Sequence, residues 1–190
     1  MGGKKRVVVV TDGDETAYRA LSEACQDLDC HPLQASKGNP TPLSGEELID
    51  AILKAPRDPV VVMVDDQGDA DAGHGETALK ALMDAPQLEV LGVVAVAANT
   101  RPVQGVKVEE SVDRSAHLVS RAVNKAGKAT SSPILGGDTV DALHSYSGVV
   151  IGLGDPGKMG GHDAIHEGVP ATKRVLQEIL RKADHIHARH

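Results

Sequence analysis

The 190-residue chain has no Trp or Phe and only two Tyr, and 27 acidic against 20 basic side chains give it a formal net charge of −7. A negative surface repels nucleic-acid phosphates and anionic lipid headgroups, and the lack of aromatic rings removes the platforms on which single-strand binders stack bases. We therefore expect no nucleic-acid partner. We also expect no direct membrane insertion, because no apolar segment is long enough to span a bilayer.

Cys25 and Cys30 are the only cysteines, so we expect two reduced, buried thiols rather than a disulfide scaffold. The apolar run near the N-terminus covers only residues 7–10, which is too short for a signal peptide. These features predict a cytosolic protein. We expect a single α/β domain over residues 1–190, with flexible ends at 1–5 and 184–190.

Continuous aliphatic runs without polar alternation are typical of strands that are covered on both faces of a parallel sheet. They predict four buried strands, at residues 7–10, 60–64, 90–98 and 149–151. Apolar residues at spacings of three and four predict helices between and after these strands, at residues 17–28, 44–55, 76–83 and 170–183. Two of these helices carry a start signal, because Ser44 and Glu47 form a capping-box pattern and Pro170 suits a first helical turn.

The stretch 101–132 departs from this pattern and shows weak alternation of apolar and polar residues. We predict an antiparallel hairpin around residues 105–124, at an edge of the sheet or over one face, with a turn candidate at 124–127. The succession of strands and helices predicts a three-layer α/β/α sandwich with a mostly parallel sheet. The fold would be Rossmann-like or topoisomerase–primase-like.

The loops that follow the predicted strands are acidic, and in parallel sheets such loops border the ligand-binding crevice. Their candidate metal ligands are Asp12, Asp14, Asp65, Asp66 and Asp155. Carboxylates that share one edge repel one another unless a hard cation relieves them, so Mg²⁺ or Ca²⁺ is the expected cofactor if there is one. The alternative is that these residues cap helix N-termini, where carboxylates complement the helix dipole.

The string Asp12-x-Asp14-x-Thr16 after a buried strand resembles the first motif of haloacid-dehalogenase-type phosphohydrolases. That resemblance implies that Asp12 attacks phosphorus and Asp14 is the general acid. In those enzymes a flap follows the motif, whereas in this chain a helix is predicted directly after it. The same Asp-x-Asp pair is similar to that of topoisomerase–primase-type domains, which hold Mg²⁺. Either similarity makes a phosphoryl-transfer enzyme the alternative function.

Two glycine-containing loops are candidate anion-binding sites. The segment 152–157 fits Gly-x-Gly-x-x-Gly, and Gly154 with Lys158 could bind an anion, but the chain after it is too short for a dinucleotide fold. A plain tight turn is the alternative. Asn39 and Thr41 lie in a turn-rich segment before a helix, where they could present backbone amides to an anion or simply join a strand to that helix.

Several blocks of sequence together resemble one family, the stage V sporulation protein AE family of spore-forming Firmicutes. The blocks that carry this resemblance are residues 10–15, 38–47, 58–66, 89–100, 111–114, 137–141 and 152–159. The resemblance runs from about Lys5 to Leu180 and is more specific than any single motif.

The resemblance implies a soluble accessory protein of sporulation and spore germination, in a group whose membrane proteins move calcium dipicolinate. These membrane proteins are then the expected partners. The implied location is the cytoplasm of the forespore or mother cell, peripheral to the spore inner membrane through protein contacts. A homo-oligomer is compatible with this interpretation. The resemblance assigns no catalytic residue to this chain.

Overall fold

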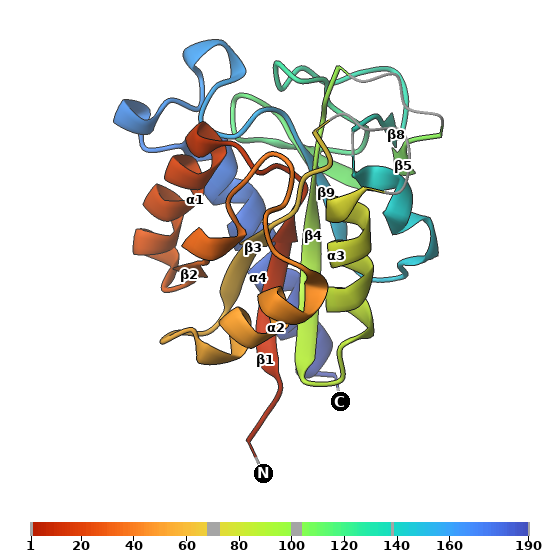
Figure 1. Cartoon of the computed structure of the whole chain (residues 1–190). Helices are drawn as coiled ribbons and strands as arrows, with labels where there is room; N and C mark the ends of the chain where they lie inside the picture. The colour runs from red at the N-terminus through yellow and green to blue at the C-terminus, as the bar shows by residue number, and fades with distance from the viewer. Residues whose placement is uncertain (1, 68–72, 100–103, 138, 190) are drawn as a thin grey trace.

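A computed structural model describes residues 2–67, 73–99, 104–137 and 139–189. Its main sheet has seven strands in the order β2-β3-β1-β4-β9-β6-β7, of which β1, β2, β3, β4 and β9 are labelled in Figure 1. Neighbouring strands are parallel except for the antiparallel pair β6 and β7. The strands of this sheet are β1 (Lys5–Val10), β2 (His31–Pro32), β3 (Val60–Met63), β4 (Leu88–Val96), β6 (Glu110–Val112), β7 (Leu118–Val119) and β9 (Val150–Leu153).

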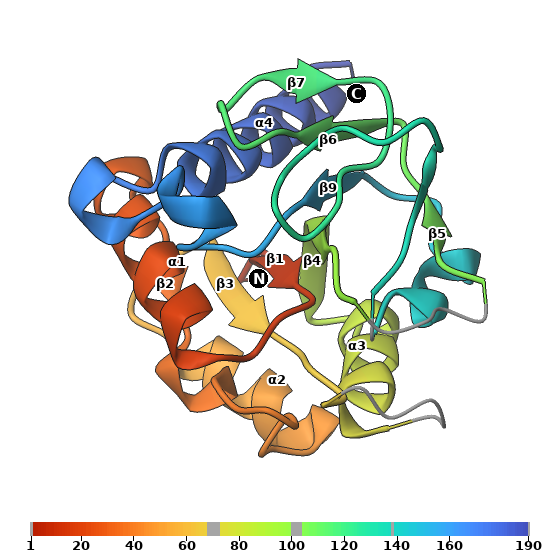
Figure 2. The ribbon, with the colours of Figure 1, turned by 90° about the horizontal axis from the view of Figure 1, so that it is seen from above.

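Four α-helices cover the two faces of this sheet. They are α1 (Glu15–Leu28), α2 (Gly45–Lys54), α3 (His74–Asp84) and α4 (Pro170–His187). Figure 2 shows α1 and α4 on one face and α2 and α3 on the other. The short 3₁₀ helix η2 (Val140–Ser145) contributes to the same apolar cluster as α2 and α3. The predicted three-layer α/β/α sandwich with a mostly parallel sheet is confirmed.

The side chains of β1 explain why its sequence is uniformly apolar. Val7 and Val9 are buried in a cluster with residues of α2 and α3, whereas Val8 and Val10 are buried in a second cluster with residues of α1 and α4. Successive side chains of a strand point to opposite faces, so a central strand in a three-layer fold needs apolar residues at every position.

The two helix-start signals are also confirmed. The Glu47 backbone N–H donates to Ser44 Oγ at 3.2 Å, and the Ser44 N–H donates to Glu47 Oε2 at 2.7 Å, which completes the capping box of α2. Pro170 occupies the first turn of α4. This helix continues to His187, beyond the apolar stripe from which it was predicted.

The predicted edge hairpin is formed by β6 and β7, which pair antiparallel beside β9. The turn candidate at 124–127 is a separate tight turn, in which the Gly127 N–H donates to the carbonyl of Asn124 at 2.8 Å. Gly127 has a φ of +72°, a conformation that glycine adopts without strain. A second antiparallel pair, β5 (Val106–Lys107) with β8 (Ile134–Leu135), lies apart from the main sheet and was not predicted.

Candidate functional site

The carboxyl ends of β1, β3, β4 and β9 meet at one edge of the sheet because these strands are parallel neighbours. The helices that follow β1 and β3 pack on opposite faces of the sheet, an arrangement that in parallel sheets marks the usual position of a ligand site. We call the carboxylates that follow these strands the acidic rim, namely Asp12, Asp14, Asp65, Asp66 and Asp155.

Asp14 is both a helix cap and an ion-pair partner. Its Oδ1 accepts from the backbone N–H of Ala17 at 2.7 Å, which caps α1, and its Oδ2 accepts from Lys158 Nζ at 2.8 Å. Asp12 Oδ1 in turn accepts from the N–H of Asp14 at 3.1 Å. Because α1 begins at Glu15, no flap separates this motif from the helix, unlike in dehalogenase-type enzymes.

Asp65 joins three segments of the rim. Its side chain accepts from the N–H of Gly13 at 2.9 Å and from the N–H of Gln67 at 2.7 Å. Its backbone N–H donates to Thr41 Oγ1 at 2.8 Å, and its carbonyl accepts from the N–H of Thr41 at 2.9 Å. Buried Thr41 therefore positions Asp65 through its backbone, whereas Asn39, two residues before it, is exposed.

Asp66 faces the other side of the sheet and caps α3. Its Oδ1 accepts from the N–H groups of Gly75 at 2.6 Å and Glu76 at 3.2 Å, and the side chain is 2% exposed. Its Oδ2 has no hydrogen-bond partner among the described residues. Residues 68–72, which continue this acidic loop, lie outside the described part of the chain.

Asp155 lies under the tight turn at 124–127. Its backbone N–H donates to the carbonyl of Lys125 at 2.9 Å, and its Oδ2 is 3.6 Å from Lys125 Nζ. A cavity of about 410 Å³ is bordered here by these two residues together with Asn99, Asn124 and Lys158. Sequence reasoning missed Lys125, because nothing in the local pattern indicates that a turn 30 positions earlier folds over Asp155.

The pKa values of the rim show that four of its carboxyl groups share one electrostatic environment. Burial, then the charge of Asp14, and then those of Asp65 and Asp155 together raise the pKa of Asp12 to about 7, against the opposing effect of the hydrogen bond from the Asp14 backbone. Burial also raises the pKa of Asp155, although Lys125 and Lys158 oppose this shift. A hydrogen bond to Asp14 raises the pKa of Lys158.

The structure thus brings together Asp12, Asp14, Asp65 and Asp155, with Lys158 at the same edge. Asp66 is directed toward α3 instead, where burial and then the charge of Asp66 raise the pKa of Glu76. Within the described ranges, no three His, Cys, Asp or Glu side chains are gathered so that they could hold a metal ion. The expected Mg²⁺ or Ca²⁺ site therefore stays a prediction, while the capping role is observed for Asp14 and Asp66.

The glycine loop after β9 forms a tight turn rather than a dinucleotide-binding loop. Gly157 has a φ of +79°, and a Cβ there would lie 3.0 Å from Thr16 Cγ2 on α1. Buried Asp163 holds this turn against the start of α4. Its carboxylate accepts from the N–H groups of Gly157 and Ala171, both at 2.8 Å, and from Thr172 Oγ1 at 2.5 Å. Asp163 was not predicted to have a role.

These contacts limit the chemistry of the rim. A carboxyl group with a pKa near 7 can donate or accept a proton at neutral pH, but a partly protonated Asp12 is a weak nucleophile. The lysines and asparagines around the cavity can bind carboxylate or carbonyl oxygens of a small ligand. Cys25 and Cys30 are buried free thiols, as predicted, and lie outside this site.

Comparison with known proteins gives one match. The model of a family described as stage V sporulation protein AE1 matches residues 6–183, a range that runs from the second residue of β1 into the last turns of α4. No curated protein and no solved structure matches the chain. In the part of the chain that the structure describes, none of the helices combines the length and the apolar composition needed to cross a bilayer.

Proposed function

The chain belongs to the stage V sporulation protein AE family and is thus a sporulation-related protein, and from that premise we propose that it is an accessory of the membrane proteins that move calcium dipicolinate. In this role it binds these channel proteins at the spore inner membrane and modulates sporulation and germination. It performs no chemistry of its own.

The observation that carries this proposal is the extent of the family match, which covers residues 6–183 rather than one motif. The rim supports a binding role over a catalytic one, because Asp14 and Asp66 are engaged as helix caps. The net charge of −7 disfavours direct attachment to anionic lipid. The route to the membrane is therefore contact with a protein.

A pull-down with detergent-solubilised channel subunits tests the proposal. We expect the chain to retain the subunits when anionic lipid is removed, because the interface is between proteins. An Asp184→Asn variant, changed at an exposed residue, serves as a folded control. Binding that disappears on removal of lipid would argue for a lipid-mediated association instead.

A second candidate is Mg²⁺-dependent phosphoryl transfer, favoured by the raised pKa of Asp12 beside Asp14 at the end of β1. It predicts phosphatase or nuclease turnover that requires Mg²⁺ and that Asp12→Asn abolishes. Turnover that is independent of the metal, or unchanged in the variant, would end this alternative. The accessory role predicts no turnover in either protein.

A further inference from the structure

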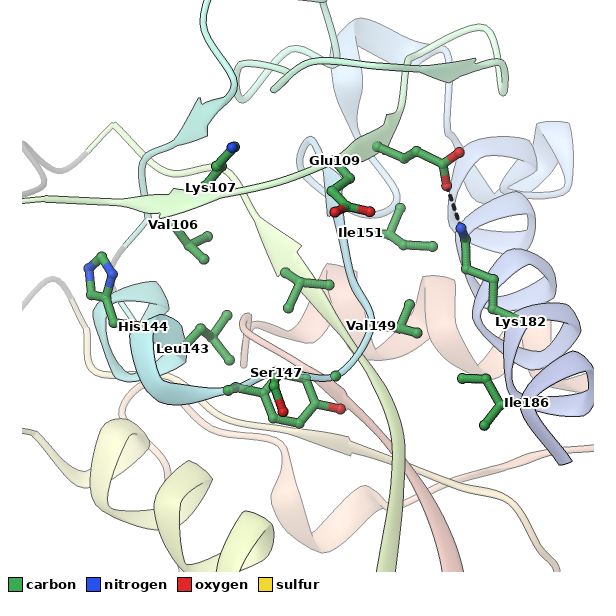
Figure 3. Close-up of a pocket in the computed structure, with 14 residues that line it drawn as sticks. Val106, Lys107, Glu109, Leu143, His144, Ser147, Val149, Ile151, Lys182 and Ile186 are labelled. Atoms are coloured by element: carbon green, nitrogen blue, oxygen red, sulfur yellow. Dashed lines mark ion pairs between the residues drawn. The ribbon is translucent and has the colours of Figure 1, made fainter. Parts of the chain in front are cut away.

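A groove lies at the opposite end of β9 from the acidic rim. It consists of two cavities of about 500 and 480 Å³ that share Val149, Lys182 and Ile186. We call it the β9–α4 groove. Figure 3 shows the first cavity between Lys107 on β5, the η2 segment with Leu143, and α4. The second cavity continues along the last turns of α4.

The floor of the groove is aliphatic. Val106, Leu143 and Ile151 are buried in the core and present their surfaces to the first cavity, and Val149 is half-buried where the two cavities meet. Ile186 on the last turn of α4 is 51% exposed, which makes it one of the large apolar side chains that the described fold leaves in solvent. Recessed apolar surface beside exposed apolar side chains is typical of a protein interaction site.

The border of the groove is basic, although the chain as a whole is acidic. Its lining includes the basic residues Lys107, Arg181, Lys182 and Arg189 and the acidic residues Glu109 and Glu110. Lys182 Nζ already pairs with Glu110 at 2.9 Å, and Arg181 pairs with buried Glu178. Lys107 and Arg189 form no ion pair with any residue in the described ranges. Glu109 is also without an ion pair in those ranges, so the groove carries a small excess of positive charge.

We propose that the β9–α4 groove binds a protein segment that combines aliphatic and acidic side chains. Aliphatic side chains of that segment pack over Val149 and Ile151, and its carboxylates face Lys107, Lys182 and Arg189. A recessed floor cannot make even contact with a flat bilayer, which favours a protein segment over a lipid surface as the occupant. The identity of the partner, but not the chemistry of its segment, rests on the proposed function.

The first test uses a labelled peptide of about 12 residues composed of Leu and Glu, and a matched peptide with Lys in place of Glu, measured by fluorescence anisotropy. We expect the acidic peptide to bind at least about tenfold more tightly than the basic one. Lys182→Glu with Arg189→Glu should reverse this preference. A control with the same charge change at exposed Arg19 and Lys128 should keep it.

Several outcomes would overturn the groove assignment. These are equal binding of both peptides, binding that the charge reversal leaves unchanged, and binding to phosphatidylglycerol vesicles in place of the peptide. If the free chain forms a dimer and Ile186→Glu abolishes that dimer, the groove binds a second copy of this chain instead.

A pull-down of the channel subunits with the same variants separates this inference from the proposed function. If the wild type captures the channel subunits and the groove variant does not, both the groove inference and the accessory role are supported. Equal capture by the two proteins overturns the groove inference and leaves the accessory role. Peptide binding without capture of the subunits supports the groove and overturns the accessory role.

Discussion

The backbone N–H of Gly13 donates to Asp65 Oδ2 at 2.9 Å, which joins the loop after β1 to the loop after β3. The carbonyl of Gly13 also accepts from the N–H of Gly38 at 2.9 Å. Three loops that are far apart in the sequence therefore meet at a residue without a side chain. This contact keeps Asp12 and Asp65 close enough for the charge of one to raise the pKa of the other.

Gly13→Ala should destabilise the fold, because a Cβ there would lie 2.0 Å from the Gly38 carbonyl oxygen and 2.8 Å from Asp65 Cβ. We expect a loss of about 2–3 kcal/mol in the free energy of unfolding, measured by urea denaturation. Gly3→Ala, where nothing lies within 4 Å of the added Cβ, is the matched control. Equal stabilities of the two variants would mean that the loops are not packed as described.

Asp12→Asn should stabilise the protein increasingly as the pH rises. The folded protein holds a proton on Asp12 up to a pKa of about 7, whereas the unfolded chain loses it near the ordinary value of 3.8. The free energy of unfolding of the wild type therefore falls as the pH rises through this window. An asparagine side chain can still accept the hydrogen bond from the Asp14 N–H and carries no charge.

The stability advantage of the Asp12→Asn variant over the wild type should grow by roughly 1–3 kcal/mol between about pH 5 and about pH 8, as followed by urea unfolding at each pH. Asp27→Asn, at an exposed carboxylate that pairs with Lys173 on the surface, should show no such growth. A difference that stays constant with pH would contradict the raised pKa of Asp12.

The elements predicted correctly from the sequence are those with a dense local signal. A short stretch of sequence is enough to predict each of them. Examples are the valine runs of β1 and β3, the capping box at Ser44 and the apolar stripe of α4. Strands of only two residues, such as β5 and β8, have no periodicity to read, since their pairing depends on partners far along the chain.

The same limit applies to the candidate site. Asp12, Asp65 and Asp155 each follow an apolar run that predicts a parallel strand. Their meeting at one edge of the sheet could therefore be predicted from the sequence. The direction of Asp66 toward α3 and the fold of Lys125 over Asp155 depend on tertiary contacts between distant segments. The spacing of residues along the chain does not determine such contacts. A cluster of acidic residues in the sequence therefore predicts where a site lies, but not which of its side chains would coordinate an ion.

Asp163→Asn should destabilise the protein more than any exposed charge substitution on α4. The buried carboxylate accepts from the N–H groups of Gly157, Ala171 and Thr172, and an amide in its place would direct a donor at these donors. We expect a loss of about 2–4 kcal/mol by thermal or urea unfolding, because hydrogen bonds to a buried charge are strong. Asp184→Asn, at an exposed site on α4, should change the free energy of unfolding little. Similar effects of the two substitutions would show that Asp163 does not organise this junction.

Divalent cations should bind the acidic rim weakly, with a dissociation constant on the order of 1 mM or higher for both Mg²⁺ and Ca²⁺. The reason is that Asp14 and Asp155 already face lysines, and Asp65 accepts from backbone amides. Calorimetric titration with each ion and with calcium dipicolinate measures these dissociation constants. Asp155→Asn should weaken the binding of the cations, whereas the control Asp27→Asn should leave it unchanged. A dissociation constant of about 10 μM or lower for a free ion would mean that the lysine pairs open to form a true metal site. Binding of calcium dipicolinate at least about tenfold tighter than Ca²⁺ would assign the rim to the complex instead, with the lysines facing its carboxylates.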